Sequence, residues 1–361
     1  MLEVLDVRAE PLDVALVEPF GIATGAQLVA ANVRVEVELT DGTIGLGEAA
    51  PFPAVSGETQ AGALASVARA RAALLGQDPG RWRHAARLLA ELMPDQPSAR
   101  CALEGALLDA LCKASGLSLW RFFGGAEQGL ETDITLTTGD VEAARRAAAR
   151  AAADGFSSLK VKVGGAPLDH DVARLRAAAD AAPGARLLLD ANAALTADDA
   201  LGLLDALGPL RARLALFEQP TPAEDLDALA RVRERAGVPI AADESARSAA
   251  DVARLAACGA VDVINVKLMK TGVAEALDMI AAARAHGLGL MIGGMVETSL
   301  AMGISACLAA GLGGFSFVDL DTPLFMRDAP TRGGPLREGP RITLGGVTRG
   351  HGVTLEPRRV V

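Results

Sequence analysis

Cysteine and histidine are scarce in this chain of 361 residues, which has four of each. Neither set shows a CxxC pair or another spacing typical of metal ligands, which disfavours a metal site built from these residues. We expect the cysteines to be buried free thiols in a reducing compartment and the histidines to lie at the surface. The residues are Cys101, Cys112, Cys258 and Cys307, and His84, His170, His286 and His351.

An excess of positive charge is also missing. The formal net charge is −10, from 35 Lys and Arg against 45 Asp and Glu. Without a basic stripe to attract phosphate groups, nucleic acid and anionic membranes are disfavoured as partners. The favoured class of function is therefore chemistry on a small molecule.

No segment has the pattern of a signal peptide or of a membrane span. The N-terminus lacks a basic region followed by a long apolar core. The stretch from Thr298 to Val318 is uncharged and long enough to cross a bilayer. However, its four glycines between Gly303 and Gly314 divide it into a buried helix, a turn and a strand. We therefore expect a cytoplasmic protein.

The sequence instead contains a series of short apolar segments that end in charged or polar residues. Lys162, Asp190, Glu218, Asp243 and Lys267 follow one another at intervals of 24 to 28 residues, the length of one βα unit. The segments are too short for helices and indicate buried parallel strands. The expected strands are Thr132 to Thr137, Leu159 to Gly164, Leu187 to Asn192, Leu214 to Pro220, Ile240 to Ser245, Val261 to Lys267, Leu288 to Gly294 and Phe315 to Asp321.

These segments predict an α/β protein with a modified TIM barrel, (β/α)7β, whose functional residues gather at the C-terminal ends of the strands. Half of the residues are apolar, so a chain of this length can bury a large core and should hold about two domains. We expect an α+β capping domain, formed by the N-terminal and C-terminal segments, over the barrel mouth. The expected division is residues 1–125 for the N-terminal part of the cap, 126–323 for the barrel and 324–361 for the segment that returns to the cap.

The expected cap begins with a hairpin. Ala31 to Leu39 alternates polar and apolar residues, Asp41-Gly42 forms a turn signal, and Ile44 to Ala49 continues the pattern. Three helical stretches are expected between about Thr59 and Gly124. After the barrel, the expected short strands are Arg341 to Leu344 and Val353 to Pro357.

The expected strand ends carry two lysines and three carboxylates. Lys162 and Lys267, on the second and sixth strands, face each other across an eight-strand ring, which suggests proton transfer on two sides of a substrate. Asp190, Glu218 and Asp243 lie on the strands between them. Convergent carboxylates without His or Cys are oxygen ligands suited to Mg²⁺. Each one alone is better explained as a helix N-cap or a solvated loop residue, but three in succession favour the metal.

Lys160 and Lys162 are two residues apart, so both side chains point to one face of their strand. We expect one ammonium to lower the pKa of the other, which would make Lys162 a usable base. A solvated charge pair is the alternative. For Lys267 the alternative is an outer lysine that contacts a neighbouring helix or loop, as we expect for Lys270. A Schiff base is the other chemistry open to a barrel lysine.

Motifs along nearly the whole chain carry a family resemblance. They are Lys160-Val161-Lys162, Asp190-Ala191-Asn192, Glu218-Gln219-Pro220, Asp243-Glu244-Ser245, Asn265-Val266-Lys267, Gly294-Met295-Val296-Glu297-Thr298 and, in the cap, Gly47-Glu48-Ala49-Ala50-Pro51 and Gly57-Glu58-Thr59. The chain resembles the enolase superfamily, in its muconate lactonizing enzyme subgroup.

The resemblance implies a metal-assisted proton transfer. It implies that Asp190, Glu218 and Asp243 bind Mg²⁺ and that the substrate carboxylate chelates this ion while an enediolate forms. Lys162 and Lys267 are then the acid and the base. Asn192 and Asn265 have supporting roles.

The end of strand eight distinguishes between the reactions of this subgroup. Asp319-Leu320-Asp321 looks like the Asp-x-Asp motif of dipeptide epimerases. Both aspartates point to one face across the ring from the metal, where they would hold the ammonium of a dipeptide. An N-succinyl group or muconate would be repelled there. The alternatives are an N-acylamino acid (N-succinylamino acid) racemase, an o-succinylbenzoate synthase or a muconate cycloisomerase, and an aspartate pair that is solvated or binds a second cation.

The capping loop, Pro19 to Ala26, bears on side-chain specificity. In Ala-Glu epimerases an arginine of this loop is expected to bind the glutamate side chain, and Gly25 stands at that position here. We therefore expect an apolar or small second residue, bound near Phe20, Ile22 and Val296. Thr135 and Lys160 complete the expected substrate-binding set.

Two further functional classes compete with an epimerase. A non-catalytic barrel would be expected to have lost a lysine or a metal ligand, and none is missing. A Schiff-base aldolase would work without Mg²⁺. The expected enzyme acts on a small molecule, has neither nucleic acid nor membrane as a partner, and forms a homo-oligomer.

Overall fold

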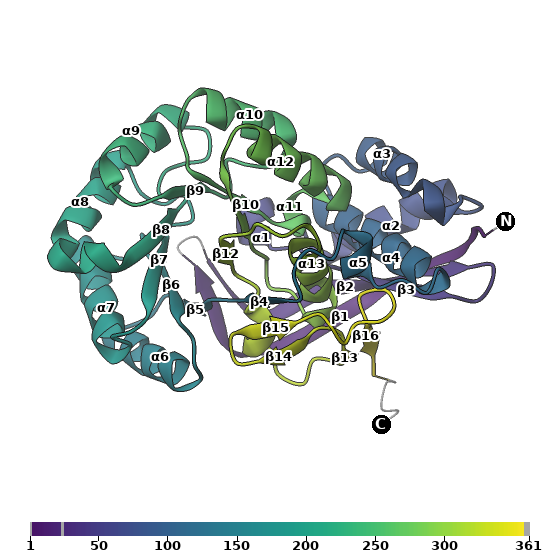
Figure 1. Cartoon of the computed structure of the whole chain (residues 1–361), viewed down its shortest axis with the longest axis horizontal. Helices are drawn as coiled ribbons and strands as arrows, with labels where there is room; N and C mark the ends of the chain where they lie inside the picture. Colours follow the sequence, from purple (N-terminus) through teal and green to yellow (C-terminus); the bar gives the residue numbers. More distant parts are fainter. Residues whose placement is uncertain (1, 23–24, 357–361) are drawn as a thin grey trace.

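Eight parallel strands form one curled sheet in the computed structural model, which describes residues 2–22 and 25–356 (Figure 1). Their order along the sheet is the order along the chain, from β5 to β12. The strands are β5 (Ile134–Leu136), β6 (Ser158–Lys162), β7 (Arg186–Asp190), β8 (Leu214–Glu218), β9 (Ile240–Ala242), β10 (Val263–Val266), β11 (Gly289–Ile292) and β12 (Phe317–Val318). The prediction of a (β/α)7β barrel is confirmed.

The register between neighbouring strands brings the predicted site residues to one level. Lys162 pairs with Asp190, which pairs in turn with Glu218. Thr135 pairs with Lys160. Residues paired across parallel strands point to the same face of a sheet, so these side chains all point into the barrel.

Hydrogen bonds beyond the regular ladders join β12 to the chain just before β5. The Asp133 N–H donates to the Val318 carbonyl oxygen at 2.9 Å, and the Leu320 N–H donates to Thr132 Oγ1 at 2.9 Å. Strand β12 itself has only two residues, and no regular ladder joins it to β5 among the described residues.

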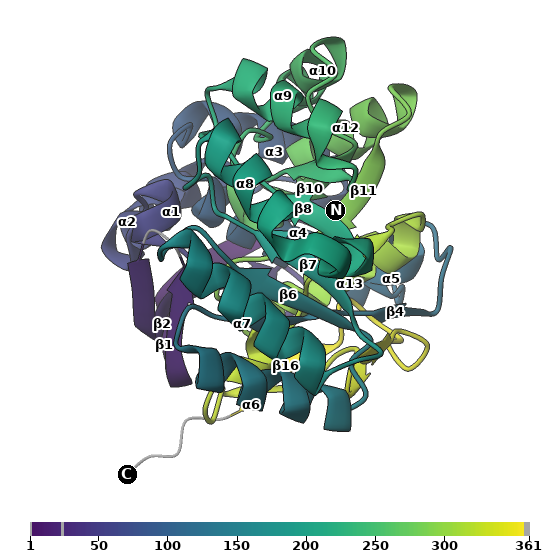
Figure 2. The ribbon, with the colours of Figure 1, turned by 90° about the vertical axis from the view of Figure 1, so that its left-hand side faces the viewer.

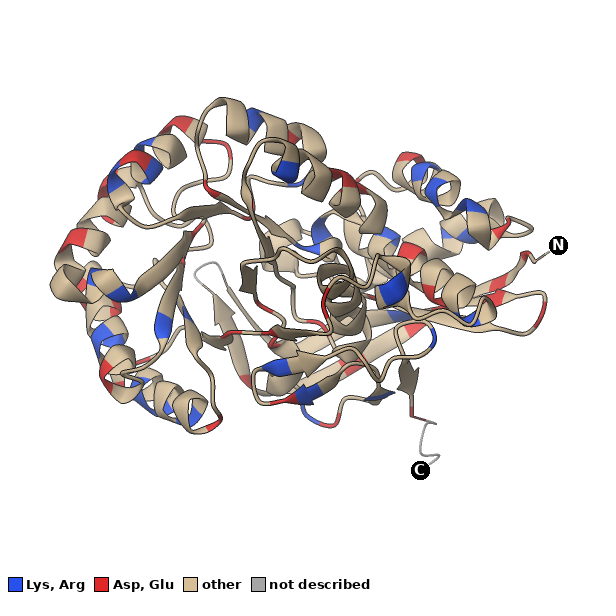
Figure 3. Ribbon diagram, viewed as in Figure 1, with Lys and Arg blue, Asp and Glu red and all other residues tan. Residues whose placement is uncertain are grey.

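Helices cover the outside of the barrel, with positive and negative side chains interspersed along them (Figure 3). Several begin at an Asp, Ser or Thr whose side chain accepts a hydrogen bond from a backbone N–H in the first turn, as Asp140 does for Ala143. None of the described helices is long and apolar enough to cross a membrane. The elements are α6 (Val141–Ala153), α7 (Leu168–Ala181), α8 (Ala197–Leu207), η2 (Gly208–Arg213), α9 (Leu226–Ala236), α10 (Ala249–Ala257), α11 (Leu268–Thr271), α12 (Val273–Ala285), α13 (Ser299–Leu312) and η3 (Thr322–Phe325).

The N-terminal segment forms an antiparallel sheet of β1 (Val4–Ile22), β2 (Gly25–Leu39) and β3 (Ile44–Ala49), which lies to one side of the barrel (Figures 1 and 2). The predicted hairpin is confirmed, but the long strand β1 was not predicted. The capping loop is shorter than expected, because most of it forms the ends of β1 and β2. Ala23 and Thr24 lie outside the described residues.

The expected helical stretches of the cap are confirmed, with shorter elements between them. Helix α4 packs so closely on β3 that Gly45 and Gly47 leave no room for a side chain. A Cβ at either position would lie 2.0 Å from a carbonyl oxygen of α4. The elements are α1 (Pro53–Ser56), α2 (Gln60–Leu74), η1 (Pro79–Arg81), α3 (Trp82–Leu92), α4 (Pro97–Ala114) and α5 (Leu119–Phe122).

The C-terminal segment forms short antiparallel strands. Strand β15 lies between β14 and β4, and β16 pairs with β13. Both predicted strands are present, although Pro357 lies outside the described residues. The strands are β4 (Gly129–Glu131), β13 (Thr331–Gly333), β14 (Leu336–Glu338), β15 (Arg341–Thr343) and β16 (Val353–Leu355).

Two expectations about rare residues were wrong. His351 is fully buried, not at the surface: its Nε2 lies 3.0 Å from the Leu46 carbonyl oxygen and 3.1 Å from Asp109 Oδ2. These contacts join residues far apart in the sequence, so local spacing could not reveal them. Cys258 is exposed at the end of α10, whereas the other three cysteines are buried as expected.

Candidate active site

A narrow cavity of about 30 Å³ lies at the C-terminal ends of the barrel strands, beneath the cap. Lys162, Lys267, Asp319 and Asp321 all line it. The cap contributes an apolar wall made of Phe20, Ile22, Phe52 and Val55. The structure thus brings both predicted lysines and both strand-eight aspartates to one cavity.

On one side of the barrel, Lys160 and Lys162 share a carboxylate oxygen. Lys162 Nζ donates to Asp190 Oδ2 at 2.6 Å. Lys160 Nζ lies 3.0 Å from the same oxygen and 2.7 Å from both Glu218 Oε2 and Asp319 Oδ2. Burial disfavours the charged form of Lys160, but the three carboxylates outweigh burial and raise its pKa well above the usual range. Lys160 is therefore held as a cation beside Lys162, and the role of Lys162 as a base stays a prediction.

On the other side, two lysines hold the carboxylate of Asp243. Lys267 Nζ donates to Asp243 Oδ2 at 2.7 Å, and Lys270 Nζ donates to Asp243 Oδ1 at 2.6 Å. The expected outer position of Lys270 was wrong, because the single turn of α11 directs this side chain back under β9, where it is buried. Burial lowers the pKa of Lys270. It also opposes the charge of Lys267, but attraction by Asp243 and Glu218 raises the pKa of that lysine.

The predicted metal ligands Asp190, Glu218 and Asp243 are buried at the ends of three neighbouring strands. The two predicted supporting residues contact them: Asn265 Nδ2 donates to Glu218 Oε1 at 2.7 Å, and the Asn192 N–H donates to Asp190 Oδ1 at 2.9 Å. Burial opposes ionisation of Asp190 and Asp243, but the nearby lysines hold both pKa values well below the usual range. Three ionised or ionisable carboxylates without His or Cys fit a hard cation such as Mg²⁺.

The geometry of these three carboxylates is not that of a closed metal cage, because lysine ammonium groups hold their oxygens. Among residues 2–22 and 25–356, the one set of three possible metal ligands whose donor atoms all lie within 4.8 Å of one another is instead Asp133, Asp319 and Asp321. The predicted set fits Mg²⁺ by the chemistry of its donors and by its position at adjacent strand ends.

The acidic group at the far end of the cavity includes one residue that was not predicted. Asp133, just before β5, is buried, and within the described part of the chain neither of its carboxylate oxygens has a hydrogen-bond partner. Burial, and then repulsion by Asp319 and Asp321, raises its pKa well above the usual range. Asp133 lies two residues before Thr135, and this inward-facing period of two was the signal that could have found it.

The two predicted aspartates differ from each other. The Thr135 N–H donates to Asp321 Oδ2 at 2.6 Å, yet burial and Asp319 raise the pKa of Asp321 to about 7. Burial also opposes the charge on Asp319, but the attraction of Lys160 lowers its pKa. Asp319 is therefore the more firmly ionised member of the pair.

Strained backbone follows the ends of β7 and β8. Asn192, Ala193 and Gln219 have positive φ values of 44°, 64° and 33°, which non-glycine residues rarely adopt. Gln219 Oε1 accepts hydrogen bonds from the Asp243 N–H at 2.9 Å and the Ser245 N–H at 3.1 Å. The strained residue Gln219 thus makes hydrogen bonds that connect the end of β8 to the end of β9.

Two glutamates near the cavity, the half-buried Glu244 and the buried Glu297, were not predicted as site residues. Burial, the largest cause, raises the pKa of Glu244 and of Glu297 to about 8 in each case. Glu297 Oε1 accepts from the Met295 N–H at 2.7 Å.

Some predicted specificity residues lie at the cavity and others do not. Phe20 and Thr135 line it, but Met295, not Val296, does so from the segment after β11. Val296 is buried with its carbonyl oxygen accepting from Asn32 Nδ2 at 2.9 Å. Gly25 is outside the described lining, and a Cβ there would lie 3.1 Å from the Ala54 side chain.

Comparison with known proteins places these features in a family. Residues 5–124 match the mandelate racemase/muconate lactonizing enzyme N-terminal domain, and residues 142–359 match the enolase C-terminal domain-like family. The chain is 52% identical, over 97% of its own length and 98% of the relative's, to an aromatic dipeptide epimerase of Herpetosiphon aurantiacus.

Solved structures are similar along nearly the whole chain. A mandelate racemase/muconate lactonizing protein from Herpetosiphon aurantiacus has a TM-score of 0.95 and 51% identity, covering 98% of this chain and 99% of that one. A dipeptide epimerase from Enterococcus faecalis, in complex with Mg and the dipeptide L-Leu-L-Tyr, has a TM-score of 0.93 and 33% identity with the same coverage. This chain therefore belongs to the mandelate racemase/muconate lactonizing enzyme family of the enolase superfamily.

Proposed function

We propose that this protein is a Mg²⁺-dependent dipeptide epimerase that inverts the α-carbon of the C-terminal residue. One observation carries the proposal: a single cavity is lined by two lysines from opposite sides of the ring and by the two aspartates after β12. The names of the relatives support it, because they include aromatic, hydrophobic and L-Ala dipeptide epimerases.

In this proposal the two lysines move the proton. One of Lys162 and Lys267 removes the α-proton from one face, and the other delivers a proton to the opposite face, so the configuration inverts. Each lysine lies within 2.7 Å of a carboxylate that sets its position. The two amines thus reach the same cavity from opposite sides of the ring, as transfer between two faces requires.

Asp190, Glu218 and Asp243 would hold the magnesium ion. When bound, Mg²⁺ supplies positive charge that stabilises the negative charge developing on the substrate carboxylate. At the other end, Asp319 and Asp321 would bind the ammonium group of the dipeptide. An N-succinyl group would meet two carboxylates there and be repelled.

The second residue of the substrate is proposed to be apolar or small. The cap wall of Phe20, Ile22, Phe52 and Val55 offers no cation to a glutamate side chain. We expect dipeptides with an apolar or aromatic second residue to have a higher kcat/KM than Ala-Glu. The proposal fails on this point if Ala-Glu is turned over about tenfold faster, by kcat/KM, than every dipeptide of that kind.

A dipeptide library in D₂O with Mg²⁺ tests the function, with mass spectrometry reading one deuterium at the α-carbon of the C-terminal residue. Uptake into dipeptides, and none with a K162M/K267M double variant, supports the proposal. Uptake into N-succinylamino acids alone would instead assign a racemase and leave Asp319 and Asp321 without an ammonium to bind. The homo-oligomeric state, the cytoplasmic location and the absence of nucleic acid or membrane partners stay predictions.

A further inference from the structure

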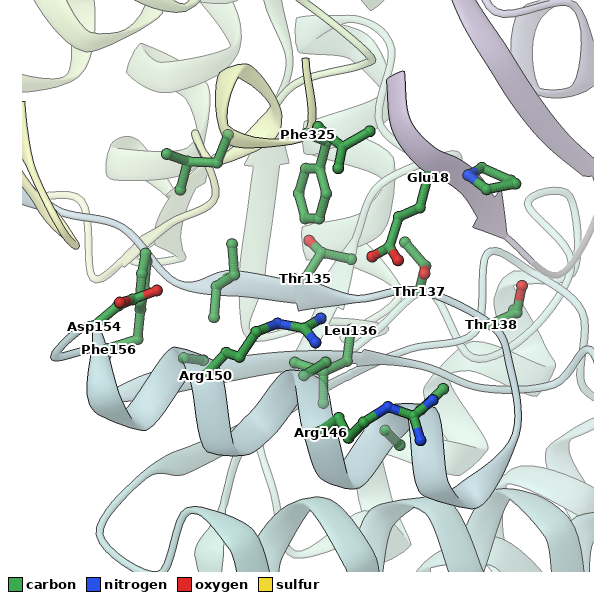
Figure 4. A pocket seen from close by; sticks show the side chains of 18 of the residues that line it. Glu18, Thr135, Leu136, Thr137, Thr138, Arg146, Arg150, Asp154, Phe156 and Phe325 are labelled. Carbon is green, nitrogen blue, oxygen red and sulfur yellow. The ribbon is translucent and has the colours of Figure 1, made fainter. Parts of the chain in front are cut away.

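A second and much larger hollow, of about 790 Å³, adjoins the catalytic cavity. It lies along α6 and β5, and the end of β1 and the η3 turn close its other side (Figure 4). Thr135 lines both hollows. We call this hollow the seam groove, and its volume is in the range of pockets that bind small molecules.

The seam groove carries charges of both signs. Arg146 and Arg150 lie one helical turn apart on α6 and extend along β5, and Glu18 points toward the same strand from β1 (Figure 4). All three side chains are exposed. Within residues 2–22 and 25–356, the side chains of Glu18 and Arg150 have no ion-pair or hydrogen-bond partner, and that of Arg146 has only Glu142 at 3.9 Å. Asp154, at the end of α6, also lines the groove, so two cations and two anions are available to a ligand.

An aromatic pair separates the seam groove from the catalytic cavity. Phe325 lines the groove and Phe20 lines the cavity. Their rings meet edge to face, with centroids 5.4 Å apart and planes at 75°. The space on the catalytic side is about 30 Å³, which is much smaller than the groove on the other side of the rings.

We infer that the seam groove is a binding site for a zwitterionic dipeptide on its way to the catalytic cavity. Arg146 and Arg150 would hold its carboxylate, Glu18 its ammonium, and Phe325 and Leu136 its apolar side chains. This inference rests on the proposed function. The physical reason is electrostatic steering: side chains of opposite charge on facing walls of a groove concentrate and orient a zwitterion, which raises its rate of association.

Kinetics of charge variants test the role of the groove in catalysis. R150Q, R146Q and E18Q should each lower kcat/KM for L-Ala-L-Phe, by about tenfold for the R146Q/R150Q pair, with kcat unchanged. R145Q is the matched control, since Arg145 lies on the same helix, pairs with Glu142 and does not line the groove. Equal kcat/KM in R145Q and R146Q/R150Q would overturn the inference.

Protection of a cysteine tests binding without any need for turnover. Ala147 lines the groove on α6, so A147C places a thiol there, and C258S removes the exposed cysteine. L-Ala-L-Phe should slow alkylation of A147C in the Mg²⁺-loaded protein. Its N-acetyl derivative and its C-terminal amide, each lacking one charge, should protect less. The R150Q change should abolish the protection.

The outcomes separate the groove from the proposed function. If a dipeptide that the enzyme epimerises does not slow alkylation of A147C, the inference about the groove is overturned and the proposed function stands. Protection that the N-acetyl derivative and the amide reproduce in full would also overturn it, because the charges would then be irrelevant. Charge-dependent protection without deuterium uptake into any dipeptide would support binding in the groove and contradict the epimerase.

Discussion

At the scale of single residues, lysines and carboxylates alternate in the site, so that each lysine lies beside a group of opposite charge. Each lysine at the strand ends contacts at least one carboxylate oxygen at 2.7 Å or less. Burial makes an unpaired charge costly, so this alternation allows a dense group of ionised side chains inside the barrel. It also means that removing Asp190 takes away the carboxylate that Lys162 contacts.

Removal of either catalytic lysine should abolish epimerisation but retain proton exchange at one face. K162M and K267M should each lower kcat by roughly 10²–10⁴-fold, because an acid–base group is lost. Each single variant should still exchange the α-proton of one epimer in D₂O, the epimer whose proton faces the remaining lysine. Exchange of both epimers by a single variant would contradict the assignment of one lysine to each face.

Replacing Asp321 should weaken binding of the substrate amino group. D321N removes a carboxylate that lines the cavity but keeps a carbonyl oxygen to accept from the Thr135 N–H. Loss of a charged hydrogen bond costs about 1.5–3 kcal/mol, so KM for a free dipeptide should rise about tenfold or more. The control is the N-acetylated dipeptide, whose weak binding should not worsen. An unchanged KM for the free dipeptide would contradict ammonium binding at Asp321.

At the scale of elements, a buried carboxylate links the cap to the barrel at the start of α12. Glu104 on α4 is fully buried, and its Oε2 accepts from the Ala274 N–H at 2.8 Å. The positive end of the α12 dipole lies there, which favours a carboxylate. Burial is the stronger influence and raises the pKa of Glu104 to about 7.

This raised pKa predicts that Glu104 makes the protein less stable as the pH rises. The folded state holds the Glu104 proton more tightly than the unfolded state, whose pKa is near 4.5. The stabilisation is complete below pH 4.5 and is lost as the pH rises to about 7, a change of about 3 kcal/mol. E104Q stays neutral and does not lose this stabilisation. Its free energy of unfolding in urea, relative to that of the wild type, should therefore increase as the pH rises through this window. A constant difference between the two proteins would exclude the effect.

At the scale of the whole molecule, the cap and the barrel are held together by buried polar contacts. Glu48 on β3 accepts from the Thr298 and Ala301 N–H groups at 2.9 and 3.1 Å, at the start of α13. Phe20, on β1, both lines the catalytic cavity and packs on Phe325 after the barrel. The cavity therefore exists only when the two parts are docked.

Bound Mg²⁺ should stabilise the whole fold, because its proposed ligands come from three strands that separate on unfolding. A ligand that binds only the folded state stabilises it by about 1.4 kcal/mol for each tenfold rise in concentration above Kd. The Tm should therefore rise with Mg²⁺ concentration and fall on addition of EDTA. E218Q should show a smaller rise. The same rise in E218Q and in the wild type would place the ion elsewhere, for example at Asp133, Asp319 and Asp321.

Much of the barrel could be predicted from local sequence. Short apolar segments identified all eight strands, and charged residues at their ends, spaced by 24 to 28 residues from Lys162 to Lys267, identified several side chains of the site. Strand β1 was missed because its alternation of polar and apolar residues is interrupted, and its register with β2 shifts between Ala15 and Phe20. Asp133 was missed because it precedes its strand, whereas active-site residues were sought only at strand C-termini.

The sequence by itself therefore determined the fold class, the family and the chemical types at each strand end, because these depend on periodicity and spacing along the chain. Only the tertiary structure decided which charges meet. In the folded protein Lys270 contacts Asp243, His351 contacts Asp109, and the arginines of α6 lie across the groove from Glu18. Burial and ion pairing depend on neighbours brought together from distant segments, and so they appear only when the chain is folded.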